Sequence, residues 1–482
     1  MSQQFIYQSI AQTLEHQIKR QVFKIGDKLP SVREICREQG VSMNTALNAY
    51  YQLESKGLIA SRPQSGYYVV YSHHKFPEIP EISQPVQDEG ADKTEQLIAD
   101  VFSVLGTETN VNFSLGVPDP KLLPIAKINK SLTRAIREMP HNGIMYDSIQ
   151  GNQKLRNQIA KGSISWEGTL TEDDLITTPG CMGALSYSLM SITKKGDVLL
   201  TESPVYFGVL QLAQSLGLQV VELPTHPDTG IDIDILEETL KKQKVAVCLL
   251  VSNFNNPTGS CMPDSHKEAV VRLLENHHVP LIEDDLYGDV YFGNKRPKSC
   301  KSFDKSGNVL WCGSVSKTLV PGYRVGWIAP GRFKEKIIST KLYQSVSSTS
   351  IVQEAVGNFL ETGRYENHLR KLRHTLHANS IQYLKAIGNY FPEGTKVSRP
   401  TGGFLIWIQL DPKLDTAILF QQALKYKISI APGRMFTLQN QYSNCIRLSY
   451  GMTWDERIDK SLKVLGMLAK QMILGFQTNT IK

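Results

Sequence analysis

Five short apolar segments, separated by stretches of helical pattern, recur between residues 197 and 329 and constrain the fold of this chain. They are DVLL (197–200), VAVCLLV (245–251), PLIED (280–284), NVLWCG (308–313) and RVGWIA (324–329). Strands that are apolar almost throughout are typical of parallel sheets covered by helices on both faces. From about residue 109 to the end, the sequence therefore predicts an α/β domain with a large, mostly parallel sheet.

Polar motifs stand at the ends of three of these strands. They occupy residues 255–259 (NNPTG), 283–287 (EDDLY) and 313–317 (GSVSK). Each alone has a purely structural interpretation: a strand-to-helix turn, an acidic helix start and a surface lysine. Ligands of parallel α/β sheets bind at the carboxyl ends of strands. The three motifs together therefore favour one binding site at that edge.

Lys317 is the candidate reactive residue of this site. It lies between Ser316 and Thr318 at the end of a predicted strand, where its amine can be positioned and partly desolvated. Such an amine can be neutral near pH 7 and form a Schiff base. Arg324 follows with the planar, forked cation that suits a phosphate.

The first 71 residues predict a separate, modestly basic unit with eight Lys and Arg against five Asp and Glu. Apolar residues Ile6, Ile10, Leu14 and Ile18 have helical spacing within 5–23. Ser31 and Glu34 form a capping box for a second helix that stops at Gly40, and Ser42 can cap a third over 43–53. The runs LIASR and GYYVV then flank residues 63–65 as a hairpin. This order predicts a winged helix-turn-helix, although spacing alone also allows a small protein-interaction module.

Residues 72–108 are interpreted as a linker, because three prolines and an excess of acids mark them, with a short helix near 93–105. The seven cysteines are scattered without paired spacing, which argues against a disulfide framework or a metal site and suits a reducing compartment. The sequence has no recognisable signal peptide and no run long enough to span a membrane. We therefore expect a cytoplasmic protein.

The segment LPSVREICREQGVSMNTALNAYYQLESKGLIASRPQSGYYVV closely resembles the winged head of GntR-family bacterial transcription regulators, and the resemblance covers residues 5–71. It implies contacts with double-stranded operator DNA from two helices and the wing. The family commonly has Arg where this chain has Met43, so one phosphate partner is absent and the neighbouring polar residues carry more of the recognition. The implied DNA-binding residues are Ser31, Arg33, Ser42, Asn44, Thr45, Asn48, Arg62 and Gly66.

Residues 109–482 resemble class I aminotransferases, which are fold-type I enzymes dependent on pyridoxal 5'-phosphate (PLP), with a large sheet domain and a smaller α+β domain. The resemblance implies that Lys317 carries PLP, that Asp284 pairs with its ring nitrogen, and that Asn256 and Tyr287 bind its phenolic oxygen. It assigns the phosphate to Ser314, Ser316, Arg324 and the backbone at Cys181 and Met182, where many relatives have Ser and Gln. It further implies that Tyr206 stacks on the ring, that Tyr146 reaches the phosphate of a neighbouring subunit, that Arg447 grips a substrate carboxylate, and that Gly116 lies beside the substrate.

A GntR-type head, a linker and an aminotransferase-like domain together resemble the MocR subfamily of regulators. This resemblance implies a head-to-tail homodimer that binds operator DNA and senses an amine or amino acid by aldimine exchange at Lys317. Two alternatives stay open. The chain can be a working class I aminotransferase with secondary DNA binding, or PLP itself can be the signal.

Overall fold

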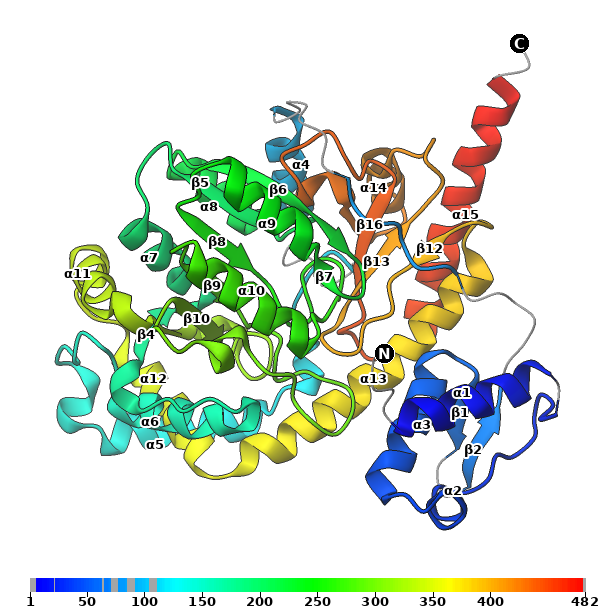
Figure 1. Ribbon diagram of the computed structural model, residues 1–482, viewed down its shortest axis with the longest axis horizontal. Coiled ribbons are helices and arrows are strands. Elements are labelled where there is room, and N and C mark those ends of the chain that lie inside the picture. The colour runs from blue at the N-terminus through cyan, green and yellow to red at the C-terminus, as the bar shows by residue number, and fades with distance from the viewer. Residues whose placement is uncertain are drawn as a thin grey trace.

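The computed structural model describes residues 6–20, 22–62, 65–70, 77–84, 92–103 and 111–479 of the chain (Figure 1). Its first unit contains helices α1 (Ile6–Lys19), α2 (Val32–Gln39) and α3 (Met43–Ser55), followed by strands β1 (Ile59–Arg62) and β2 (Gly66–Val69). The two strands pair antiparallel, with Ile59 opposite Val69. The predicted order of three helices and a hairpin is confirmed, and Pro63 and Gln64 at its tip lie outside the described residues.

Caps fix the turn between α2 and α3 as the sequence predicts. Ser31 and Glu34 form the capping box, and Gly40 ends α2 with a left-handed φ of 62°. The hydroxyl of Ser42 accepts a hydrogen bond from the backbone amide of Thr45 at the start of α3. The first helix ends at Lys19 rather than at residue 23.

The first helix is shorter because the chain turns away after it. The amide of Val22 donates to the carbonyl of Gln17, which closes the carboxyl end of α1. Of the predicted apolar face, Ile10, Leu14 and Ile18 are buried, whereas Ile6 is exposed.

The stretch interpreted as a linker packs against the rest of the chain wherever the structure describes it. The amide of Val397 donates to the carbonyl of Glu78 at 2.6 Å, and the hydroxyl of Ser83 donates to the carbonyl of Ser203 at 2.6 Å. Helix α4 (Asp92–Ser103) follows and buries Val101. The predicted helix 93–105 is thus present, with residues 104 and 105 outside the described residues.

The large domain is built on a sheet of eight strands in the order β4-β11-β10-β9-β8-β5-β6-β7. Strands β10, β9, β8, β5 and β6 run parallel, whereas β11 and β7 are antiparallel to their neighbours, so the mostly parallel sheet is confirmed. The bounds are β4 (Ile176–Pro179), β5 (Val198–Ser203), β6 (Gln219–His226), β7 (Gly230–Ile231), β8 (Val247–Leu250), β9 (Leu281–Asp284), β10 (Val309–Ser314) and β11 (Val325–Ala329).

Helices cover both faces of this sheet, because successive residues of each strand point to opposite sides. Leu199 and Leu249 pack with α7 (Gly180–Ile192) and α8 (Phe207–Ser215) on one face. Leu200 and Leu250 pack with α9 (Ile233–Lys242) and α10 (Asp264–Asn276) on the other. The remaining helices of the large domain are α5 (Ile125–Glu138), α6 (Gln153–Ser163), α11 (Lys334–Ser345) and α12 (Ser350–Glu361).

The smaller domain has a four-stranded antiparallel sheet in the order β12-β13-β16-β15 and three helices. Among these, α13 (Arg364–Tyr390) reaches from the large domain toward the N-terminal head (Figure 1). None of the described helices has the length and apolar composition needed to cross a bilayer. The other elements are β3 (Val111–Asn112), β12 (Lys396–Val397), β13 (Leu405–Gln409), α14 (Thr416–Leu424), β14 (Ile428–Ser429), β15 (Ala431–Pro432), β16 (Cys445–Ser449) and α15 (Glu456–Asn479).

Candidate functional site

A cavity of about 210 Å³ lies where the three polar motifs meet. Strands β8, β9 and β10 are adjacent and parallel, so the segments that follow them emerge at the same edge of the sheet. The cavity brings together eleven of the residues predicted from the sequence. They are Gly116, Cys181, Met182, Tyr206, Asn256, Asp284, Tyr287, Ser316, Lys317, Arg324 and Arg447.

Lys317 extends its amine into this cavity from the turn after β10. The Nζ atom donates a hydrogen bond to the carbonyl oxygen of Gly116. Burial, followed by the positive charge of Arg447, lowers the pKa of Lys317 to about 8, against the opposing effect of Asp284. The neutral amine that a nucleophile requires is therefore far more abundant near physiological pH than in an ordinary lysine, although the protonated form still predominates.

Asp284 ends β9 and is buried on the same edge. Its Oδ1 atom accepts hydrogen bonds from the thiol of Cys181 at 3.3 Å and from the amide of Leu286 at 3.1 Å. Burial raises the pKa of Asp284 to about 6, while these two donors lower it. The carboxylate is thus mostly ionised at pH 7. The sequence assigned only backbone donors to Cys181, whereas its side chain contacts this acid.

Two buried polar atoms in the cavity wall have no hydrogen-bond partner among the described residues. They are the hydroxyl of Tyr287 and the Nε atom of Arg447. Nη1 of Arg447 donates to Oδ1 of Asn256 at 2.9 Å, and Nη2 donates to the carbonyl of Ser114. Because unpaired buried donors cost free energy, a ligand that offers oxygen acceptors fits this wall.

The opposite end of the cavity suits an anion. Nη1 of Arg324 donates to the hydroxyl of Ser316 at 3.2 Å. Gly180, with a φ of 75°, starts α7 beside this guanidinium, and a Cβ atom there would lie 2.3 Å from Nη2 of Arg324. Ser314 does not line the cavity; its hydroxyl donates to that of Ser316 at 2.7 Å.

The structure also adds residues that the sequence did not single out. Phe102 of α4 lines the cavity, as does Ser114, whose carbonyl accepts from Arg447. Ser114 stands two residues before Gly116, so the motif around that glycine could have indicated it, but nothing in the sequence connects Phe102 to the site. Tyr146 does not line the cavity and is 84% exposed.

The predicted DNA-binding residues lie at the start of α2, in and just before the first half of α3, and in the wing. Ser31, Arg33 and Ser42 are exposed, and Thr45 and Asn48 are half-buried on α3. Asn44 stands in the first turn of α3 and Arg62 ends β1, with both side chains outside the described residues; Gly66 opens β2 with a φ of 107°.

The cavity fits PLP, which when bound supplies an aldehyde that condenses with amines and a ring that withdraws electrons. Each functional group of PLP has a matching protein group in the cavity. The amine of Lys317 matches the aldehyde, the carboxylate of Asp284 matches the ring nitrogen, and the unpaired hydroxyl of Tyr287 matches an acceptor oxygen. The guanidinium of Arg324 and the backbone N–H groups at the start of α7 would bind the phosphate. Such a site, on a fold-type I body behind a winged helix-turn-helix, defines a PLP-dependent protein that binds DNA.

Comparison with known families agrees with this class. Residues 110–465 match aminotransferase class I and II, and residues 6–69 match bacterial regulatory proteins of the gntR family. The chain therefore belongs to the MocR subfamily of GntR-type transcriptional regulators, and its cofactor is PLP.

Individual relatives support both parts. The chain is 35% identical over 460 residues to the uncharacterized HTH-type transcriptional regulator YjiR of Escherichia coli, covering 95% of this chain and 98% of that one. Kynurenine aminotransferase of Pyrococcus horikoshii, solved with PMP, is 26% identical with a TM-score of 0.73 and covers 80% of this chain and 96% of its own. The α-aminoadipate aminotransferase LysN of Thermus thermophilus, complexed with N-(5'-phosphopyridoxyl)-L-leucine, is 26% identical with a TM-score of 0.72, covering 79% and 97%.

Proposed function

We propose that this transcriptional regulator senses an amine or amino acid at the cavity around Lys317 and reports it to operator DNA through its winged head. The observation that carries the proposal is the buried amine of Lys317, whose pKa is lowered to about 8, in one cavity with Asp284 and Arg447. A ligand amine would displace Lys317 from the cofactor, and a ligand can shift the protein only through different affinities for its two states.

Each residue of the cavity has a role in this proposal. Lys317 would hold the cofactor through its amine, and that amine would become free where a ligand amine takes its place. Asp284, ionised above pH 6, would keep the ring nitrogen protonated, and the unpaired hydroxyl of Tyr287 would donate to the phenolic oxygen beside Asn256. Arg447 offers its unpaired Nε, so a ligand with a carboxylate is favoured over a simple amine. Tyr206 lines the same wall, where an aromatic ring can stack on the cofactor.

We further propose a homodimer in head-to-tail arrangement. Support comes from apolar residues that a single chain leaves exposed: Tyr146, Ile144 and Met145 precede α6, and Tyr343 and Leu342 lie on α11. Exposed apolar surface of this kind is typical of interfaces. In the single chain, the ring of Tyr51 on α3 lies 6.0 Å from that of His377 on the chain's own α13; packing of each head near the partner's large domain stays a prediction.

The experiment that tests the function combines purified PLP-loaded protein with single amino acids and with an oxo-acid acceptor. Cofactor absorbance, product formation and operator affinity are followed in the same samples. A sensor gives an absorbance change and a change in operator affinity with no sustained product. Sustained amino transfer without any effect on operator binding would overturn the proposal in favour of an aminotransferase. A response to PLP alone, with no response to any amine, would instead make the cofactor the signal.

A further inference from the structure

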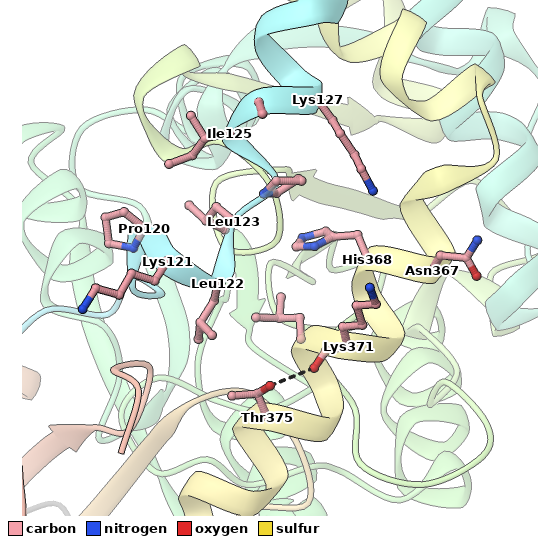
Figure 2. Close-up of a pocket in the computed structure, with 13 residues that line it drawn as sticks. Pro120, Lys121, Leu122, Leu123, Ile125, Lys127, Asn367, His368, Lys371 and Thr375 are labelled. Carbon is pink, nitrogen blue, oxygen red and sulfur yellow. Dashed lines mark hydrogen bonds between the residues drawn. The ribbon is translucent and has the colours of Figure 1, made fainter. Parts of the chain in front are cut away.

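A second cavity, of about 510 Å³, lies outside the cofactor site (Figure 2). Residues 120–127, which lead into α5, form one wall, and residues 367–375 of α13 contribute the other. No residue lines both this cavity and the one around Lys317. Nothing in the proposed function uses it.

The cavity is positively charged without compensation. Lys127 enters from α5, and His368 and Lys371 enter from α13, so that two amines and an imidazole face the same space (Figure 2). No Asp or Glu belongs to its lining, and within the described residues neither Lys127 nor Lys371 forms an ion pair, nor does Lys121 at the rim. Like charges gathered without counter-charges repel one another, and a bound anion would relieve this repulsion.

The imidazole of His368 is fixed in its orientation. Its Nε2 donates to the carbonyl oxygen of Thr318 at 2.6 Å, which leaves the rest of the ring facing the cavity (Figure 2). Burial lowers the pKa of His368, the hydrogen bond to Thr318 raises it, and the charge of Lys127 lowers it again. The ring is therefore neutral at pH 7 and adds no positive charge, so the charge of the cavity comes from the lysines.

The remaining wall is apolar. Leu122, Leu123 and Leu372 line it, and the first turn of α5 has no acidic residue and no side-chain cap at Pro124. The helix end adds a partial positive charge to that of the side chains. The cavity thus combines a cationic side with an apolar side, as a site for a small organic anion requires.

We propose that this cavity binds a small organic anion whose phosphate or carboxylate group lies between the amines of Lys127 and Lys371 and whose apolar body lies on the leucines. The site is distinct from the place of the cofactor and of the sensed amine. One of its lining residues on α13, His368, donates a hydrogen bond to the carbonyl of Thr318, which is the neighbour of Lys317.

The test uses full-length protein saturated with PLP, so that the cofactor's own phosphate site is occupied. Phenyl phosphate, benzoate, inorganic phosphate and the neutral benzyl alcohol are titrated separately by calorimetry. We expect saturable binding of phenyl phosphate or benzoate at one molecule per chain, and the tighter of the two identifies the acidic group. Benzyl alcohol should bind at least tenfold more weakly.

The matched variants are Lys127→Gln with Lys371→Gln, and Lys130→Gln as control. Lys130 is exposed on α5 and does not line the cavity. The double variant should weaken anion binding at least tenfold, whereas the control should leave it unchanged, with identical circular dichroism and cofactor spectra for all three proteins. Absence of saturable binding, equal binding by the double variant, or equal binding of benzyl alcohol each overturns the proposal.

Discussion

At the scale of the residue, Lys317 owes its reactivity to where the chain places it. An ordinary lysine has a pKa of 10.5, but the cavity buries the amine of Lys317 and sets Arg447 nearby, which lowers its pKa to about 8. We expect Lys317→Ala to lose the absorbance of the covalent cofactor link and to keep its fold. The measurement is the visible spectrum after incubation with PLP, with circular dichroism for the fold.

Lys336→Ala is the control for that substitution, because Lys336 is an exposed lysine on α11. It should keep the full cofactor spectrum. An unchanged spectrum in Lys317→Ala would show that another amine carries the cofactor.

The lowered pKa of Lys317 also predicts how cofactor uptake depends on pH. Only the neutral amine attacks the aldehyde, so the rate of uptake by cofactor-free protein should rise with pH and level off above about 8, rather than near the 10.5 of an ordinary lysine. Arg447→Gln removes a charge that lowers this pKa, so its midpoint should move to higher pH. Free PLP titrates equally with the wild type and with Arg447→Gln, so the difference between their midpoints is a property of the protein. Coincident midpoints would contradict the effect assigned to the charge of Arg447.

Among the site residues, those near strand ends could be predicted from the strand pattern itself, whereas Arg447 within β16 was implied by the family resemblance. Asn256, Asp284 and Lys317 lie close to the ends of β8, β9 and β10, and parallel strands bring such positions to one edge. Phe102 and the thiol contact of Cys181 with Asp284 could not be predicted, because they depend on how distant segments pack. Tyr146 is exposed in a single chain, so the role that the family resemblance implies for it would require a second subunit.

At the scale of the element, the N-terminal head was predictable because its helix ends are marked by local chemistry. Ser31 with Glu34, Gly40 and Ser42 each act within a few residues. The end of α1 and the packing of residues 77–84 were not predictable, because backbone hydrogen bonds to Gln17 and Val397 decide them. Such bonds leave no side-chain pattern in the sequence.

The exposure of Arg33 on α2 leads to a prediction for this element. Arg33→Ala should weaken binding to a DNA fragment selected by the wild-type protein and lower the salt dependence of binding by a slope of about 0.9 for each phosphate that the arginine neutralises. Fluorescence anisotropy at several salt concentrations measures both. PLP uptake should stay unchanged, because Arg33 lies on α2 and does not line the cofactor cavity. Loss of uptake would contradict the division into two functional units.

At the scale of the whole molecule, α13 connects the site to the head. Near its start, the hydroxyl of Tyr365 donates to Oγ1 of Thr318 at 2.7 Å, and His368 donates to the Thr318 carbonyl. Farther along, the ring of His377 stacks on Phe292 at 4.9 Å and meets the edge of Tyr51 on α3 at 6.0 Å. One helix thus contacts both the neighbour of Lys317 and the helix predicted to enter the DNA groove.

This arrangement predicts that His377→Ala uncouples the head from the cofactor site. Wild-type protein should bind the selected DNA with different affinities when loaded with PLP and when free of it. In His377→Ala the ratio of these affinities should fall toward 1, by a factor on the order of 5 for a coupling free energy of about 1 kcal/mol. The cofactor spectrum should not change, because His377 does not line that cavity.

Lys385→Ala supplies the control for this substitution, because Lys385 is exposed on the same helix, beyond the contact with Tyr51. Anisotropy titrations of the three proteins, each with and without PLP, give the six affinities that the comparison needs. If His377→Ala kept the wild-type ratio, the contact between α13 and α3 would be packing without coupling. If Lys385→Ala lost the ratio as well, the effect would belong to the stability of α13 rather than to its contact with the head.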